Sequence, residues 1–159
     1  MKKILSLVLV VIMALSLVAC GGGKSASAAD SNVIRVGVFE PQTGENGGGG
    51  IQEVYGIRYA NQIYKKVMIG DKEYTIELVE VDNKSDKTEA VNAAQKLIAE
   101  KVAVVLGSYG SGVSIAAGDY FKEAHIPAIG CSCTNPQVTN GNEYYFRTCF
   151  LGMDQGNKF

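Results

Sequence analysis

The sequence predicts an α/β fold, a doubly wound parallel sheet with helices on both faces. Short segments rich in β-branched residues alternate along the chain with longer segments of helical periodicity. Val102–Leu106 is continuously apolar, which is typical of a strand covered on both faces. Strands that alternate with helices imply right-handed crossovers between parallel strands, and so a single open sheet.

The strand predictions rest on β-branched content and on alternation. Val33–Phe39 is short and β-branched, and Tyr74–Asp82 alternates, with apolar residues at Ile76, Leu78 and Val81. The other predicted strands are Val102–Leu106, Pro127–Gly130 and Tyr144–Thr148.

Three helices are predicted between these strands. Ile51–Val67 has apolar residues spaced to fall on one face. Asp86 is the expected N-cap of the second helix, and Glu89, three residues on, would complete a capping box. The third helix is predicted over Ser111–Ala124. The buried stripe of the second helix is predicted to be Ala90, Val91, Ala94, Leu97 and Ile98.

The first residues have the pattern of a bacterial lipoprotein signal. Lys2 and Lys3 precede the apolar run Ile4–Val18, which is shorter than the roughly 20 residues that a membrane-spanning helix needs. The run ends in Leu-Val-Ala-Cys, which resembles a lipobox. Residues 1–19 are therefore predicted to be a signal peptide, Cys20 to carry a diacylglyceryl group, and residues 20–32 to form a flexible tether. An ordinary secretory signal with an incidental cysteine is the alternative.

Composition excludes several function classes. The net charge is −1, or −3 once Lys2 and Lys3 are removed, and no basic cluster indicates a nucleic-acid partner. His125 is the only histidine, which excludes a histidine-based triad or a histidine-rich metal site. Cys131 and Cys133 are too few for a closed zinc site without donors from elsewhere. No phosphate loop or dinucleotide fingerprint is present, so neither a metal nor a cofactor is expected.

The predicted sheet places a ligand crevice beyond the carboxyl ends of its strands. With a strand order of 2-1-3-4-5, the loops 40–50, 108–111 and 131–136 would face one crevice. Ser108 and Ser111 flank a glycine-rich turn at a helix start, where unpaired N–H groups and the helix dipole suit a small anion such as a carboxylate. The alternative is that either serine caps the helix.

From Val33 onward the chain resembles the N-terminal lobe of branched-chain amino acid binding proteins, the type I periplasmic binding family that serves ABC importers. The matching stretches are Ile34-Arg35-Val36-Gly37-Val38, Pro41-Gln42-Thr43-Gly44, Val81-Asp82-Asn83, Val104-Val105-Leu106-Gly107-Ser108, Ile126-Pro127, Thr134-Asn135-Pro136 and Phe146-Arg147-Thr148. The resemblance implies that residues 33–159 form one lobe of a two-lobe clamshell, truncated before the second lobe.

The resemblance also implies roles for individual residues. Ser111 would donate a hydrogen bond to the ligand carboxylate, Thr134 would offer its hydroxyl, and the backbone of Ser132 would help to hold an ammonium group. The loop around Gly49 would border the side-chain end of the pocket. Family members can carry an aromatic residue in that loop, where this chain has the glycines 47–50. Their disulfide is not available, since Ser85 and Gly110 occupy its positions.

The expected function is therefore capture of an amino acid, or a similar small polar solute, outside the cytoplasmic membrane, and its delivery to an ABC permease without catalysis. A sensor input domain of the same fold is one alternative. A flavodoxin-like enzyme is another, but Glu40 is the only carboxylate directly after the first strand and has no obvious partner in the sequence.

Overall fold

The computed structural model describes residues 32–152. The predicted signal peptide, Cys20 and the tether up to residue 31 lie outside the described residues. None of the helices in the described part is long and apolar enough to span a membrane.

The centre of the fold is a six-stranded sheet with the order β2-β3-β1-β4-β5-β6. All neighbouring strands are parallel except β2 and β3, which form an antiparallel hairpin at one edge. With β2 set aside, the order is the predicted 2-1-3-4-5. The strands are β1 Val33–Glu40, β2 Lys66–Ile69, β3 Lys72–Asp82, β4 Val104–Leu106, β5 Ala128–Gly130 and β6 Tyr145–Arg147.

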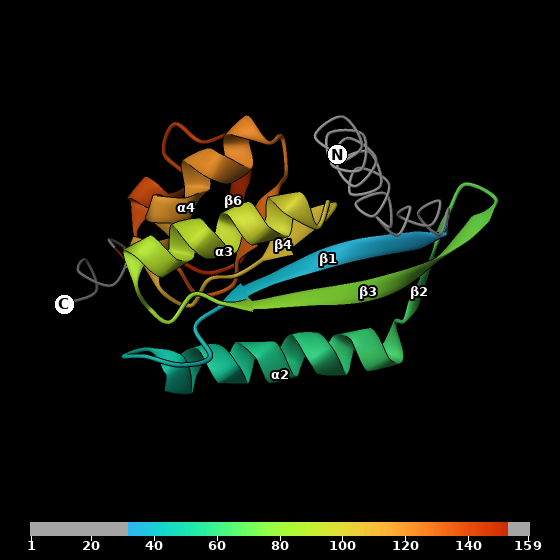
Figure 1. Ribbon diagram of the computed structural model, residues 1–159, viewed down its shortest axis with the longest axis horizontal. Coiled ribbons are helices and arrows are strands. Elements are labelled where there is room, and N and C mark those ends of the chain that lie inside the picture. Colours follow the sequence, from blue (N-terminus) through green and yellow to red (C-terminus); the bar gives the residue numbers. More distant parts are fainter. Residues whose placement is uncertain (1–31, 153–159) are drawn as a thin grey trace, which may run out of the picture. The chain divides into compact units, whose positions relative to one another are not determined.

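Helices cover both faces, as the sequence predicted. Helix α3 (Lys87–Ala99) and helix α4 (Ser111–Glu123) pack side by side on one face. Helix α2 (Gly47–Ile63) lies along β1 and β3 on the other face (Figure 1). A short 3-10 helix, Pro136–Val138, follows β5.

The first predicted helix was wrong at both ends. Helix α2 begins at Gly47, so the glycines 47–50 form its first turn instead of a loop. It ends at Ile63, and Val67 lies in β2, paired with Tyr74. A tight turn with Gly70 at φ +60° joins β2 to β3. Tertiary pairing at the sheet edge thus overrides a helical periodicity that happens to continue past the end of α2.

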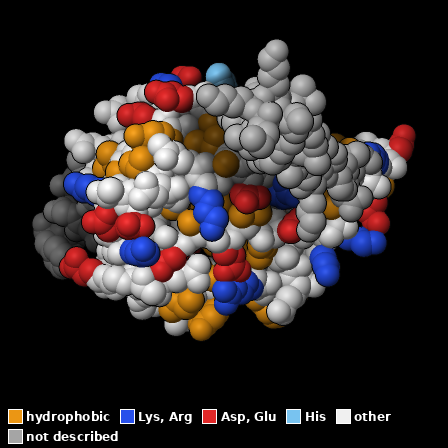
Figure 2. Space-filling model, viewed as in Figure 1, with side chains coloured by type: hydrophobic (Ala, Val, Ile, Leu, Met, Phe, Trp, Pro, Cys, Tyr) orange, Lys and Arg blue, Asp and Glu red, His pale blue; other side chains and the backbone are white. Residues whose placement is uncertain are grey.

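The core lies between the sheet and the α3–α4 layer. Phe39, Leu97, Val105 and Phe121 are fully buried there. The rings of Phe39 and Phe121 meet edge to face, with centroids 5.5 Å apart. Each of these side chains stabilises the fold by roughly 1.5–3 kcal/mol through burial. The α2 side is less complete, since Tyr55, Tyr59 and Ile63 are more than half exposed, and Figure 2 shows apolar side chains reaching the surface over α2.

Candidate ligand-binding site

The predicted loops meet at the carboxyl edge of β1, β4 and β5. The backbone N–H of Tyr109, after β4, donates to Glu40 Oε2 at the end of β1 (2.7 Å). The backbone N–H of Asn135, after β5, donates to Ser111 Oγ at the start of α4 (3.2 Å). Parallel strands that lie side by side therefore bring together loops distant in the sequence, and the edge holds several polar groups.

The start of α4 lacks a side-chain cap. Its N-cap is Gly110, which makes no side-chain cap hydrogen bond, so neither Ser108 nor Ser111 has the capping role that the sequence left open. By contrast, the Asp86 carboxylate caps α3, accepting from the N–H groups of Thr88 and Glu89 (2.8 and 2.9 Å). An uncapped helix start offers N–H donors and the positive end of the dipole to an anion.

The loop after β5 lies against this helix start. Ser111 and Thr134 are both half-buried, and the carbonyl of Thr134 accepts from Gly152 N–H (2.8 Å). The guanidinium of Arg147 fixes the loop by donating to the carbonyls of Cys133 (3.2 Å) and Asn135 (3.0 Å). Arg147 on β6 therefore holds the backbone on both sides of Thr134.

Two of the predicted site residues have surroundings that the sequence did not indicate. Ser108 is fully buried, and its hydroxyl accepts from Asn83 Nδ2 (2.9 Å). Gly49 lies in the first turn of α2, where an added Cβ would come within 2.4 Å of the Tyr109 ring. The ring therefore packs directly on the Gly49 backbone. Tyr109, 40 % exposed and missed by sequence reasoning, supplies an aromatic group beside the glycine-rich first turn of α2.

A carboxyl pair lies at the same edge. Glu40 is fully buried, and Glu53 from α2 is its partner, which the sequence did not reveal. Burial, and then the hydrogen bond and charge of Glu53, raise the pKa of Glu40 from 4.5 to about 9, against the lowering effect of the Tyr109 N–H. Burial and the nearby Glu53 and Glu40 raise the pKa of the Cys131 thiol to about 12. With a pKa of about 9, the Glu40 carboxyl group is protonated and neutral at pH 7.

The three cysteines of the described residues are free thiols. Cys133 is buried, whereas Cys131 and Cys149 are half-buried.

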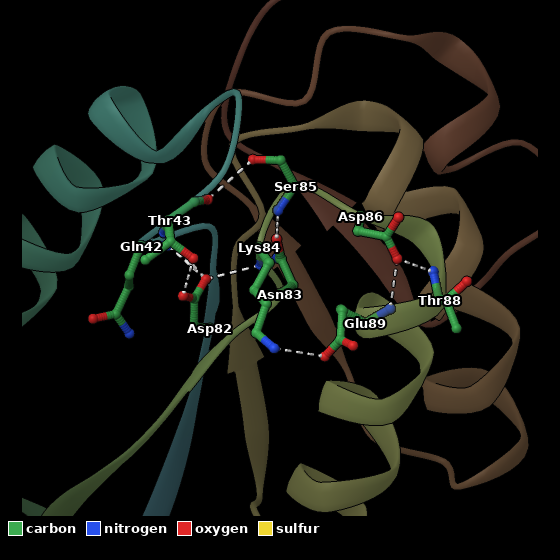
Figure 3. Close-up of polar contacts among 9 residues, drawn as sticks. All are labelled: Gln42, Thr43, Asp82, Asn83, Lys84, Ser85, Asp86, Thr88 and Glu89. Atoms are coloured by element: carbon green, nitrogen blue, oxygen red, sulfur yellow. Dashed lines mark hydrogen bonds and ion pairs between the residues drawn. The ribbon is translucent and has the colours of Figure 1, made fainter.

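A third carboxyl group, that of Asp82, ties the loop after β1 to the loop between β3 and α3 (Figure 3). Its Oδ1 accepts from the N–H groups of Gln42 and Lys84 (both 2.8 Å), and its Oδ2 accepts from the Thr43 hydroxyl (2.6 Å). Partial burial opposes ionisation, but the hydrogen bonds prevail and lower the pKa of Asp82. Gly44, at φ +80°, allows the two loops to lie this close together. A Cβ at this position would be 2.0 Å from the Lys84 carbonyl oxygen.

The predicted capping box is half correct. Asp86 caps α3, but Glu89 does not reach back to the Asp86 N–H, which donates to the Asn83 carbonyl (3.0 Å). Glu89 instead pairs with Lys84 (3.2 Å).

The comparisons with known proteins identify the family of the chain. Residues 33–158 match the family model described as periplasmic binding protein, and the chain belongs to that family. It is 35 % identical over 144 residues to "Leu/Ile/Val-binding protein homolog 2" of Brucella abortus (strain 2308), covering 89 % of this chain and 36 % of the relative. The chain thus spans about a third of the length of this relative.

Solved structures of substrate-binding proteins share the fold. The leucine binding protein LivK from Thermotoga maritima is 34 % identical, with a TM-score of 0.72 over 77 % of this chain and 34 % of that one. LivJ from Streptococcus pneumoniae, in complex with isoleucine, is 29 % identical, with a TM-score of 0.67 over 76 % and 34 %. A solute binding protein from Rhodopseudomonas palustris BisB5, in complex with 3,4-dihydroxybenzoic acid, is 25 % identical, with a TM-score of 0.68 over 75 % and 32 %. The resemblance noted in the sequence is confirmed.

Proposed function

We propose that the chain is the N-terminal lobe of an extracytoplasmic substrate-binding lipoprotein of an ABC importer. The complete protein captures an amino acid of the branched-chain type, or a similar small carboxylate, between two lobes and delivers it to the permease. Family membership supports the binding role and the location outside the cytoplasm.

The uncapped start of α4 carries the proposal. Ser111 stands at this start, and the loop with Ser132 and Thr134 lies beside it. The ligands of the two similar structures, isoleucine and 3,4-dihydroxybenzoic acid, share a carboxylate and little else. A carboxylate is the group that helix N–H donors and a serine hydroxyl recognise.

The remaining roles follow from position. The Ser132 backbone assists with an ammonium group, and Gly49 with the Tyr109 ring borders the side-chain end of the solute. The Ser108 hydroxyl, buried behind the loop, can still donate one hydrogen bond toward the crevice while it accepts from Asn83.

The test is solute affinity of the complete protein, measured by calorimetry with leucine, isoleucine and benzoate. Ser111→Ala and Thr134→Ala should each weaken binding of the preferred solute by about 10- to 100-fold, the effect of losing a hydrogen bond to a charged group. Thr88→Ala is the matched control, because it removes an exposed hydroxyl at the capped start of α3. Unchanged affinity in both site variants would remove the proposed carboxylate site.

Lipid anchoring and the two-lobe architecture have their own measurement. The intact mass of the protein extracted from membranes should exceed twice 16.9 kDa and include a diacylglyceryl group on Cys20. Residues 30–159 alone should gain little thermal stability from leucine, since most of the solute would stay in water. Equal affinity of this lobe and the complete protein would contradict a shared pocket.

A further inference from the structure

Three side chains from separate elements converge beside the proposed solute site. Glu40 ends β1, Glu53 projects from α2, and Cys131 follows β5. One potential ligand atom from each lies within 4.8 Å of the others. Within residues 32–152 no other such group of three acidic, histidine or cysteine side chains occurs.

Each carboxyl group of this cluster has one oxygen held by a donor and one oxygen left over. Glu40 Oε2 accepts from the Tyr109 N–H (2.7 Å), and Glu53 Oε1 accepts from the Ser132 hydroxyl. Glu40 Oε1 and Glu53 Oε2 are buried and no protein donor reaches them, so the hydrogen bond between the two groups requires a proton on one of them. Glu40 is fully buried, and a buried oxygen without a hydrogen-bond partner is unfavourable. We therefore expect a proton or a cation to lie between the two carboxyl groups.

We propose that Glu40, Glu53 and Cys131 bind a divalent transition-metal ion, with Zn²⁺ the preferred cation. Tetrahedral Zn²⁺ accepts thiolate and carboxylate ligands together, whereas Ca²⁺ and Mg²⁺ require six or more oxygen ligands and avoid sulfur. Three protein ligands leave a fourth position open, which is typical of a site that exchanges an external ligand. The Tyr109 N–H and the Ser132 hydroxyl orient the carboxylates, as outer hydrogen bonds do around bound metals.

The competing occupant is a proton shared by Glu40 and Glu53. Metal binding would displace that proton and the thiol proton of Cys131, since metal ligands bind deprotonated. The two occupants differ in one respect that can be measured, because only a metal ion recruits the sulfur.

The site would connect three elements that border the solute crevice. A bound ion would join the ends of β1 and β5 to α2, and through Glu53 it would fix Ser132, a predicted solute contact. The inference does not depend on the proposed function, since the metal site is complete within this lobe.

The experiment is metal titration of the full chain, stripped with a chelator and carrying Cys20→Ser so that this thiol does not compete. Cobalt(II), a spectroscopic substitute for Zn²⁺, should bind once per chain and give a sulfur-to-metal charge-transfer band. The band should be lost in Cys131→Ser and retained in the matched control Cys149→Ser.

Zn²⁺ affinity, measured by competition with a chromophoric chelator, should fall at least 10-fold in Glu40→Gln and in Glu53→Gln. The exposed Glu77→Gln serves as the control and should leave affinity unchanged. Circular dichroism of each metal-free variant checks folding. Should Glu40→Gln fail to fold, the half-buried Glu53 and Cys131 decide the question.

A missing charge-transfer band, a band that survives Cys131→Ser, or equal Zn²⁺ affinity in Glu53→Gln would overturn the metal site. If this chain binds the metal but the complete protein binds none of the tested solutes, only the proposed function is contradicted.

Discussion

The fold shifts the pKa values of two carboxyl groups at the carboxyl edge of the sheet, Asp82 and Glu40, in opposite directions. They are register partners on β3 and β1, so their backbones are direct neighbours. The oxygens of Asp82 accept hydrogen bonds from Gln42, Thr43 and Lys84, and its pKa is lowered. Glu40 has one donor, a carboxyl neighbour and complete burial, and its pKa is raised to about 9.

The difference separates a carboxylate that is satisfied by its surroundings from a carboxyl group that is not. Asp82 is satisfied, and it holds two loops in place at little electrostatic cost. Glu40 lies beside a second carboxyl group and has only the Tyr109 N–H as a donor, and groups with such perturbed pKa values concentrate at binding and catalytic sites. Four predictions test this contrast.

Gly107→Ala should disrupt the Glu40 side of the edge. Gly107 has φ +121°, and an added Cβ would lie 2.1 Å from the Phe39 carbonyl oxygen and 2.6 Å from Glu40 Oε1. We expect a loss of about 3 kcal/mol in the free energy of unfolding, from positive-φ strain and overpacking together. Gly70→Ala, at φ +60° with open space around it, is the control and should lose only about 1 kcal/mol in urea denaturation. Equal losses would mean that the close approach at Gly107 is unimportant.

Glu40→Gln should stabilise the chain in a chelating buffer at pH 7, by about 3 kcal/mol. With a folded pKa of about 9 against 4.5, the folded state keeps a proton that the unfolded state has lost. Stability of the unaltered chain therefore falls as pH rises from about 4.5 to about 9, and the amide removes this slope. Urea denaturation across this range measures the effect, and an unchanged slope in the variant would show that Glu40 ionises freely.

Asp82→Asn should destabilise the fold by about 1–2 kcal/mol at pH 7, because its hydrogen bonds lose the carboxylate charge. The pH dependence has the opposite sign to that of Glu40. A lowered folded pKa means that the contribution of Asp82 is present above about pH 4 and is lost as pH falls through the folded value. The variant should lose less stability than the unaltered chain between about pH 5 and pH 2. Parallel curves would remove the contrast between the two carboxylates.

Ser108→Ala should have the smallest effect, a loss of roughly 1 kcal/mol, as the buried Asn83 amide loses its acceptor. Thermal unfolding measures this loss. Ser114→Ala, which removes a hydroxyl that donates to the Gly110 carbonyl within α4, provides a comparison in the same layer. A larger loss of stability in Ser108→Ala than in Ser114→Ala would indicate that the hydrogen bond between Asn83 and Ser108 supports the region around Glu40.

The candidate site was predicted unevenly from the sequence. The loop of Thr134 lies beside Ser111 because this loop and α4 follow neighbouring strands, and the alternation of strands and helices predicted that these strands are parallel. Glu53 was missed, although a signal existed: it lies four and seven positions before Ile57 and Ala60, on the apolar stripe that faces the sheet. A carboxylate on such a stripe needs a partner. Tyr109 had no comparable signal, since only packing on Gly49 reveals its place.

Local patterns were enough to predict the fold class, the parallel direction of the main strands, the N-cap of α3 and the sheet edge at which the loops meet. These features follow from periodicity and capping, which act within a few residues of the chain. Only the tertiary structure decided that Val67 leaves the helix for an edge hairpin, that α4 begins without a side-chain cap, and that Glu40, Glu53 and Cys131 meet. Those outcomes depend on burial and on contacts between elements far apart in sequence, which no local pattern encodes.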